Sequence, residues 1–471
     1  MKKIITSVLI AICIQFNAFS QTCNPPPFTS QEQIDDFSTN YPNCTEIDGS
    51  IEIVGDDITN LYGLNQIISI TKNLSIHDCK DLENLVGLEN LVNIGMNLLL
   101  YRNDSLFDLT GLDNLGSYFS GGIWIEENPS LIDISNLNTI TTIEGDLVIT
   151  DNQSLPNLAG LDYVVHIGGR LDIYRNESLS SLNGLGNLFS VGDRLAISGN
   201  ISLNDISSLE ELNTVDGDFG IWENNNLVSL YGLNSLSSVT GNFAVQSNDA
   251  LINFGDMPSF SSIGGNFEIY NNNSLLNFNG LNFLTSIGVH FIVSENQSLV
   301  NFVGLENLTL IGEDLSIYGN TSLNSLTGLE KSSFNSLSIW YNPLLTECDI
   351  LSVCKFLDNQ TGYTQIQNNG PNCNSPAEVQ LICESSSISD YNALNLISIY
   401  PNPASNNITI ETPTKGSLSI LNINGQVLLQ QEVTEPSTTI DVSTLLDGIY
   451  TLRLVGEKGV QVGKFIKQKT E

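Results

Sequence analysis

The chain has 471 residues, with 52 acidic and 16 basic side chains, and carries a net charge of −36 at pH 7. Such an acidic surface repels phosphate backbones, which excludes nucleic acid as a partner. The sequence has three histidines and lacks a zinc signature, a Gly-x-Ser-x-Gly elbow and a phosphate-binding glycine loop. We therefore expect no enzyme activity, no catalytic residues, no metal site and no cofactor.

Residues 1–20 are predicted to be a signal peptide. Lys2 and Lys3 precede an apolar run that ends at Phe16, and Ala18-Phe19-Ser20 supplies a cleavage site before Gln21. We expect no transmembrane segment, because no other apolar stretch is long enough to span a bilayer. Residues 21–50 are predicted to form an N-terminal cap.

Residues 51–345 contain a regular repeat, with a period of about 24 residues that falls in the range of solenoid repeats. Twelve segments carry the phrase apolar-x-apolar-x-x-Asn, with Cys for Asn in one copy, and nine of their eleven intervals are equal. A degenerate copy at Ile51 precedes them. Each unit is too small to bury its own apolar face, so the period predicts a solenoid of about 13 coils.

Within a coil, apolar residues two apart predict a short strand with one face inward. The Asn that ends each copy of the phrase is predicted to form an internal ladder, because its amide can satisfy backbone groups at a buried turn. The ladder residues are Asn103, Asn128, Asn152, Asn176, Asn200, Asn224, Asn248, Asn272, Asn296, Asn320 and Asn342, with Cys79 in the first full copy.

The outward face of the predicted sheet carries an unusual number of aromatic residues. Four of them are evenly spaced at twice the repeat period, so that one falls in every second coil. High β propensity and duplication of a coil pair explain such a row structurally. The functional hypothesis is a binding surface for an extended glycan or peptide. The candidate ligand-binding residues are Tyr101, Trp124, Tyr174, Trp222, Tyr270, Tyr318 and Trp340.

Cysteines flank the repeats on both sides. Cys23 and Cys44 precede the first coil, and residues 346–383 form a Cys-rich C-terminal cap with Cys348, Cys354, Cys373 and Cys383 as disulfide candidates. The last four allow three connectivities, between which the sequence does not choose. The serine-rich stretch that follows predicts a linker at residues 384–395.

Residues 396–471 alternate strands with turns and predict a small antiparallel β-sandwich. Asn424-Gly425 is a hairpin signal between two apolar runs. The other landmarks of this segment, in chain order, are Tyr400-Pro401-Asn402-Pro403, then Gly448 with Tyr450, and Lys464.

These motifs resemble two families. Residues 45–345, with their Asn ladder, resemble the leucine-rich repeats of receptor L-domains, which implies a right-handed solenoid with a parallel sheet on one face. Residues 396–471 resemble the type A C-terminal sorting domain of the type IX secretion system, with Gly425 in the hairpin. That resemblance implies the type IX machinery as partner and transport across the outer membrane, followed by anchoring or release.

The sequence therefore predicts a mainly β protein that is secreted, displayed at the cell surface and used for recognition or adhesion. Its outward sheet face would bind a glycan or an extracellular protein. A structural surface protein without a specific ligand is the alternative, and a secreted enzyme or enzyme accessory is the third. A saturable ligand separates the first from the second.

Overall fold

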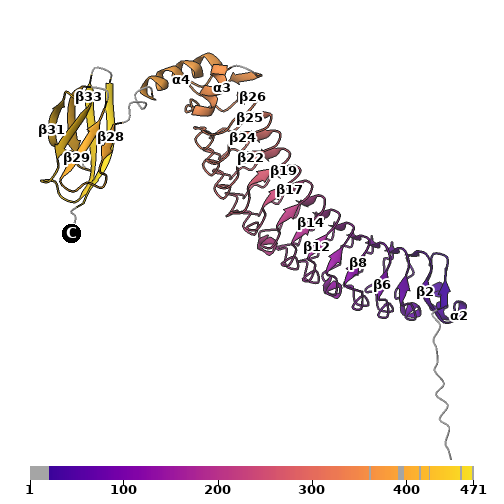
Figure 1. The fold of residues 1–471 in the computed structure, drawn as a ribbon. Coiled ribbons are helices and arrows are strands. Elements are labelled where there is room, and N and C mark those ends of the chain that lie inside the picture. Colours follow the sequence, from indigo (N-terminus) through magenta and orange to yellow (C-terminus); the bar gives the residue numbers. More distant parts are fainter. Residues whose placement is uncertain are drawn as a thin grey trace, which may run out of the picture. The chain divides into compact units, whose positions relative to one another are not determined.

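The computed structural model describes residues 21–359, 362–390, 397–412, 415–423, 425–456 and 459–468. The predicted signal peptide lies outside the described residues. The chain divides into two compact units, Met1–Pro376 and Ala377–Glu471. The first is a stack of coils and the second begins with a helix that is followed by antiparallel strands (Figure 1).

One parallel sheet of 14 strands runs along the first unit. Each strand pairs in register with its equivalents in the neighbouring coils, so that Ile173 lies between Ile149 and Ile197. The strands are β3 (Ile51–Val54), β5 (Leu74–His77), β7 (Leu98–Tyr101), β9 (Ile123–Glu126), β11 (Leu147–Thr150), β13 (Leu171–Tyr174), β15 (Leu195–Ser198), β17 (Phe219–Trp222), β19 (Phe243–Gln246), β21 (Phe267–Tyr270), β23 (Phe291–Ser294), β25 (Asp314–Tyr318), β26 (Ser336–Trp340) and β27 (Thr364–Gln367).

The return path of each coil adds shorter strands, which form two further parallel sheets. The first contains β1 (Gln21–Cys23), β2 (Cys44–Ile47), β4 (Ser69–Ile70) and β6 (Asn93–Ile94). The second contains β8 (Tyr118–Phe119), β10 (Thr142–Ile143), β12 (His166–Ile167), β14 (Ser190–Val191), β16 (Thr214–Val215), β18 (Ser238–Val239), β20 (Ser262–Ile263), β22 (Ser286–Ile287) and β24 (Leu310–Ile311). Three coils also carry a single 3-10 turn, at η1 (Tyr62–Leu64), η2 (Ser135–Leu137) and η3 (Ser207–Leu209).

The core lies between these sheets and continues from coil to coil. The inward residues of the strands are fully buried, and the phenylalanines of neighbouring coils stack on one another, with ring centroids 4.9 Å apart for Phe267 and Phe291. The glycine that recurs in most return paths has a positive φ, which is 114° at Gly184, and a side chain at Gly184 would collide with the carbonyl of Leu158. The recurring glycine is therefore required both by conformation and by close packing.

The predicted Asn side chains form a hydrogen-bonded ladder inside the stack. The Asn200 amide nitrogen donates to the carbonyls of Ile173 (3.0 Å) and Ser198 (3.1 Å), and its oxygen accepts from the Asn176 backbone N–H (3.0 Å). The Cys79 thiol occupies the same place and donates to the carbonyls of His77 (3.4 Å) and Ile53 (3.7 Å). Each coil is thereby tied to both of its neighbours.

The sheet contains one coil more than the sequence predicted. β27 pairs with β26, and Asn369 continues the ladder by accepting from the Asn342 backbone N–H (3.0 Å). The pattern conceals this coil because Thr364 replaces the apolar opener and helix α3 (Leu351–Asn359) lengthens the return path. The prediction of about 13 coils was therefore one short.

Both ends of the stack carry disulfides. The N-terminal segment holds the short helices α1 (Gln31–Asp35) and α2 (Phe37–Asn40) and a disulfide between Cys23 and Cys44. After the last repeats, Cys348 is bonded to Cys373. Cys354 and Cys383 are also disulfide-bonded, so all six predicted cysteines take part in disulfides.

The predicted linker is wrong over its first part, because helix α4 (Pro376–Asp390) runs through residues 384–390. Proline suits the first turn of a helix, where its missing N–H has no intrahelical role. Serine has only modest helix propensity. The serine-rich segment nevertheless has no glycine or proline that would stop the helix before Asp390.

The second unit holds two antiparallel sheets around one core. One sheet contains β28 (Ser398–Tyr400), β29 (Asn407–Glu411) and β32 (Ser437–Asp441), and the other contains β30 (Gly416–Leu421), β31 (Val427–Val433), β33 (Gly448–Gly456) and β34 (Gly459–Lys467). Ile408 and Ile440 from the first sheet pack with Leu418 and Leu452 from the second. The hairpin between β30 and β31 turns through Gly425, whose φ is 76°.

The sorting motif residues connect the start and the end of the second unit. Asn402 donates from its side chain to the Lys464 carbonyl (3.3 Å) and accepts from the Ile466 N–H (2.9 Å). The Tyr450 hydroxyl donates to the Leu446 carbonyl (2.7 Å). Motifs that are distant in sequence are thus joined in the folded domain.

The ladder predicts a large stability effect for Asn200→Ala. The substitution leaves the buried Asn176 N–H without its acceptor, so we expect a loss of about 2 to 4 kcal/mol in the free energy of unfolding. Asn204→Ala removes an exposed side chain that makes one local hydrogen bond and is the matched control. Urea unfolding followed by circular dichroism measures both. Equal stabilities of the two variants would contradict a structural ladder.

The Cys79 thiol is predicted to be unreactive in the folded protein. Its side chain is fully buried, and this burial raises the pKa of the thiol to about 11. At pH 8 about one thiol in a thousand is then ionised. We expect iodoacetamide to label the peptide containing Cys79 only after unfolding in guanidinium, as read by mass spectrometry. Rapid labelling of the native protein would show that the ladder opens at this coil.

Candidate functional site

The strand register places the outward aromatics in one row across the main sheet. The backbone positions of Tyr174, Ser198, Trp222, Gln246 and Tyr270 pair successively from strand to strand. The row continues through Ser294, Tyr318 and Trp340 and begins with Tyr101 at its other end. The aromatic row is defined here as Tyr101, Tyr174, Trp222, Tyr270, Tyr318 and Trp340.

One predicted binding residue, Trp124, lies outside this row, and most of the rings in the row are less exposed than an outward-facing position suggests. Trp124 lies on the same face of its strand, two residues before the row position that Glu126 occupies. Tyr174 and Tyr270 are 37% and 38% exposed, whereas the other members of the row are half-buried.

Rings at the ends of the row stack on aromatic rings of the adjacent coil. Tyr318 and Trp340 have centroids 4.6 Å apart with planes inclined by 10°, and Tyr101 stacks in the same way on His77 at 4.4 Å. In the middle of the row, Ser198 stands between Tyr174 and Trp222. Because serine is much smaller than an aromatic residue, a space about as wide as one strand remains between the side chains of Tyr174 and Trp222.

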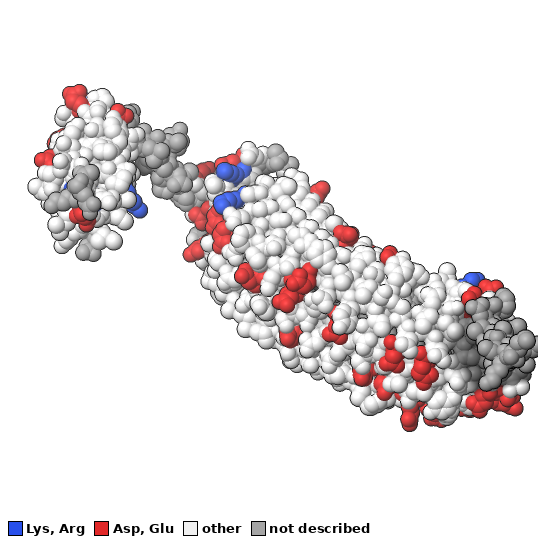
Figure 2. Space-filling model, turned by 60° about the horizontal axis from the view of Figure 1, so that its bottom comes forward, with Lys and Arg blue, Asp and Glu red and all other residues white. Residues whose placement is uncertain are grey.

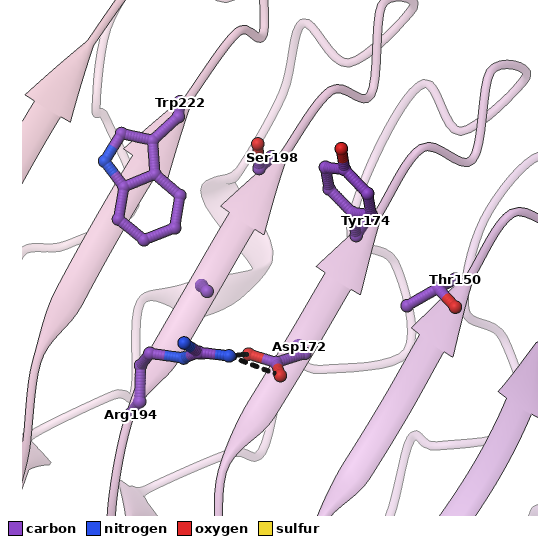
Figure 3. Close-up of a pocket in the computed structure, with 7 residues that line it drawn as sticks. Thr150, Asp172, Tyr174, Arg194, Ser198 and Trp222 are labelled. Carbon is purple, nitrogen blue, oxygen red and sulfur yellow. Dashed lines mark hydrogen bonds and ion pairs between the residues drawn. The ribbon is translucent and has the colours of Figure 1, made fainter.

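This opening is a hollow of about 240 Å³ on the outward face of the sheet. The aromatic hollow is lined by Thr150, Asp172, Tyr174, Arg194, Ala196, Ser198 and Trp222. In Figure 3 Tyr174 and Trp222 stand on either side of Ser198, while Asp172 and Arg194 meet at the other end of the strands. The hollow therefore has apolar rings along one part and a charged pair along another.

A glycine allows Trp222 to lie close to its own strand. A Cβ added to Gly220 would overlap the Trp222 indole ring. Gly220 pairs with Ala196 and Ala244, so three small residues stand side by side on three strands. Glycine inside a strand weakens it and often marks a close approach by a ligand or another backbone. These residues form a low floor beside the indole.

The charged end of the hollow is a bidentate ion pair. The Arg194 Nη2 lies 2.8 Å from Asp172 Oδ1 and 2.6 Å from Oδ2, and the Arg194 Nε lies 3.1 Å from Oδ1. Arg170 approaches the same carboxylate to 3.3 Å. The hydrogen bond to Asp172 raises the pKa of the Arg194 guanidinium, which therefore stays charged over the physiological range.

Sequence reasoning missed this ion pair because it considered only one outward position in each strand, the one that the aromatic row occupies. Arg170 and Arg194 stand directly before the openers of two consecutive coils, and Asp172 follows the first of these openers. Two arginines one repeat period apart, in a chain with 16 basic side chains, were the available signal. Their pairing depends on side-chain direction, which the repeat alone does not give.

A second hollow of about 550 Å³ lies where the strands end. Its cations are already paired with acids of the preceding coil: Lys80 lies 2.8 Å from Asp56 and Arg102 lies 3.0 Å from Asp78. Four acids and three cations line it: Asp78, Asp104, Glu127, Asp151, Lys80, Arg102 and Arg175. Exposed pairs of this kind contribute about 0 to 1 kcal/mol each, and the hollow has no surplus positive charge for an anion.

Acidic side chains are also numerous outside the two hollows. Figure 2 shows acidic side chains scattered over one face of the coils, with few basic ones. Burial, followed by the charge of Glu127, raises the pKa of Glu126. Among the described residues, no group of three His, Cys, Asp or Glu side chains is placed to hold a metal ion. Within the same residues no helix is long and apolar enough to cross a membrane.

Two known families match the chain. The Receptor L domain family matches residues 43–141, and the Secretion system C-terminal sorting domain family matches residues 398–468. No curated protein matches the chain. The first match covers the early coils, whose strand pairing continues unchanged into the later ones. The second match covers the antiparallel unit and identifies the type IX secretion machinery as its partner.

The chain is therefore similar to receptor L domains over its early coils and carries a C-terminal sorting domain, which indicates export across the outer membrane to the cell surface or the extracellular space.

Proposed function

We propose that this protein acts in recognition or adhesion and that its aromatic row binds an extended extracellular ligand, either a glycan or another protein. Export by the sorting domain supports this proposal, because it presents the repeats to the surroundings of the cell. The aromatic row supplies the contact surface. Aromatic side chains that remain partly exposed in an ordered row are a feature of binding surfaces.

The observation that carries the proposal is the aromatic hollow between Tyr174 and Trp222. A sheet surface selected only for stability would gain from β-branched residues on its strands. Here Ala196, Gly220 and Ala244 keep the surface low beside the indole, and Gly220 weakens its own strand. We interpret this arrangement as room for a ligand, whereas in a purely structural protein the glycine would serve only to seat the indole.

The polar groups that line the hollow are suited to binding a ligand rather than to catalysing a reaction. Both oxygens of the Asp172 carboxylate accept hydrogen bonds from Arg194, and Arg170 lies 3.3 Å away, so the carboxylate is already engaged in ion pairs. The neighbouring hydroxyls of Thr150 and Ser198 have no histidine among the residues that line the hollow. These groups can hold a ligand by hydrogen bonds, and nothing among them is arranged to activate a nucleophile.

The double substitution Trp222→Ala with Tyr270→Ala is predicted to remove binding without unfolding the protein. Both side chains point away from the core, and loss of two aromatic contact residues should weaken affinity at least about 100-fold. Arrays of glycans and extracellular proteins, probed with the full secreted chain, identify the ligand. Biolayer interferometry then compares the affinities of the variants.

The matched control is Tyr163→Ala with Tyr231→Ala, which removes two exposed rings from the return paths. The control should bind as the unaltered protein does, and all variants should keep the same circular dichroism. A ligand that binds both double variants equally well would refute the aromatic row as the binding surface. The absence of any saturable ligand would support the structural alternative.

A further inference from the structure

We propose that the ligand is an uncharged chain of β-1,4-linked pyranose units and that one sugar ring sits in the aromatic hollow. This inference rests on the proposed function of the aromatic row and specifies its ligand class. The hollow, the fixed ion pair and the two-coil spacing of the rings each contribute to it independently.

The size and lining of the hollow suit a single sugar ring. Its volume of about 240 Å³ is smaller than sites for drug-sized ligands, which span roughly 300 to 1,000 Å³. Tyr174 and Trp222 supply flat apolar faces, against which the C–H face of a pyranose packs. Ser198 lies between them and is 9% exposed, so it forms a polar floor.

The ion pair suits the hydroxyl groups of a neutral sugar. The Asp172 carboxylate accepts hydrogen bonds and the Arg194 guanidinium donates them, so a hydroxyl that does both can bridge the pair. Because Arg194 compensates Asp172, and Arg170 is paired with Asp146 as well, the hollow offers no uncompensated partner to a charged group. A charged ligand would lose hydration there without replacing it.

An extended peptide fits this surface less well. Peptides commonly bind sheets by adding a strand at an edge, where backbone groups are free. The row crosses the interior of the sheet, where strands such as β13, β15 and β17 have hydrogen-bonded neighbours on both sides. A protein partner would also favour a larger continuous apolar core than two rings separated by serine.

The spacing of the rings matches the repeat of a β-1,4-linked chain. Tyr174, Trp222, Tyr270 and Tyr318 occupy every second strand, which places them about 9.6 Å apart at the usual strand separation. In a β-1,4-linked pyranose chain the ring faces alternate, so the chain repeats every two units. That repeat is close in length to two strand separations, whereas an α-1,4-linked chain curls away.

A second part of the row repeats the pattern. Ser294 stands between Tyr270 and Tyr318, as Ser198 stands between Tyr174 and Trp222. Ser294 is 1% exposed, and its hydroxyl has no hydrogen-bond partner within the described residues. An unmet buried hydroxyl costs about 1 to 3 kcal/mol. Because this hydroxyl is shielded from solvent, a sugar hydroxyl supplies the missing partner only if a neighbouring side chain moves aside.

The test uses Gly220→Ala in the full secreted protein. Gly220 lies in extended backbone, where alanine is acceptable, so the new Cβ acts mainly by displacing the Trp222 ring that it would overlap. The matched control is Gly186→Ala, because a Cβ at Gly186 would have no atom within 4 Å. Isothermal titration calorimetry measures binding of cellohexaose, xylohexaose, maltohexaose and polygalacturonate, and near-ultraviolet circular dichroism reports the indole environment.

We expect a β-1,4-linked hexaose to bind the unaltered protein and Gly186→Ala equally, and Gly220→Ala at least about tenfold more weakly with an altered indole signal. Maltohexaose and polygalacturonate should not bind. Equal binding of all four saccharides would overturn the inference, as would a β-linked hexaose whose affinity Gly220→Ala leaves unchanged.

The outcomes also separate this inference from the proposed function. If none of the four saccharides binds, while a protein found on the array binds in a manner sensitive to Trp222→Ala with Tyr270→Ala, the glycan inference fails and the proposed function stands. If no ligand of either class depends on the aromatic row, both fail.

Discussion

The Asn ladder is the interaction on which the rest of the repeat unit depends. An amide such as that of Asn200 joins three backbone groups from two coils, and the ladder continues to the coil on its other side. The turn that ends a strand is buried, so its backbone groups have no water to bond. Fixing this turn fixes the strand register, because a slip of one residue would exchange the buried and exposed faces.

The same register produces the surface that binding requires. Since every strand is aligned with the next, residues that are one repeat period apart in sequence become neighbours, and a two-coil sequence rhythm becomes a spatial rhythm of rings. Rings on adjacent coils stack on each other, as Tyr318 and Trp340 do, and leave no space. Rings on alternate coils leave a strand width open, which a ligand can occupy.

Sequence reasoning succeeded where a residue type recurs for a local physical reason. The strands, the ladder and the outward row follow from period, burial and turn chemistry. The sorting domain was found through its resemblance to a known family, and the disulfides were expected from export to an oxidising compartment. Sequence reasoning failed where one copy departs from the pattern: Thr364 hides the last coil, and the serines after Cys383 conceal the end of α4. The Asp172–Arg194 pair was missed because side-chain direction across coils, rather than period, brings the two residues together.

The most direct test of this account is the dependence of affinity on ligand length. Calorimetric titration with β-1,4-linked oligosaccharides of two to eight units measures whether register and binding are connected. If the rings on alternate coils act as successive contacts, affinity rises in steps of two sugar units as each further ring is reached. An affinity that is already complete with two units, or that rises equally with every unit, would show that the two-coil spacing of the rings does not determine binding.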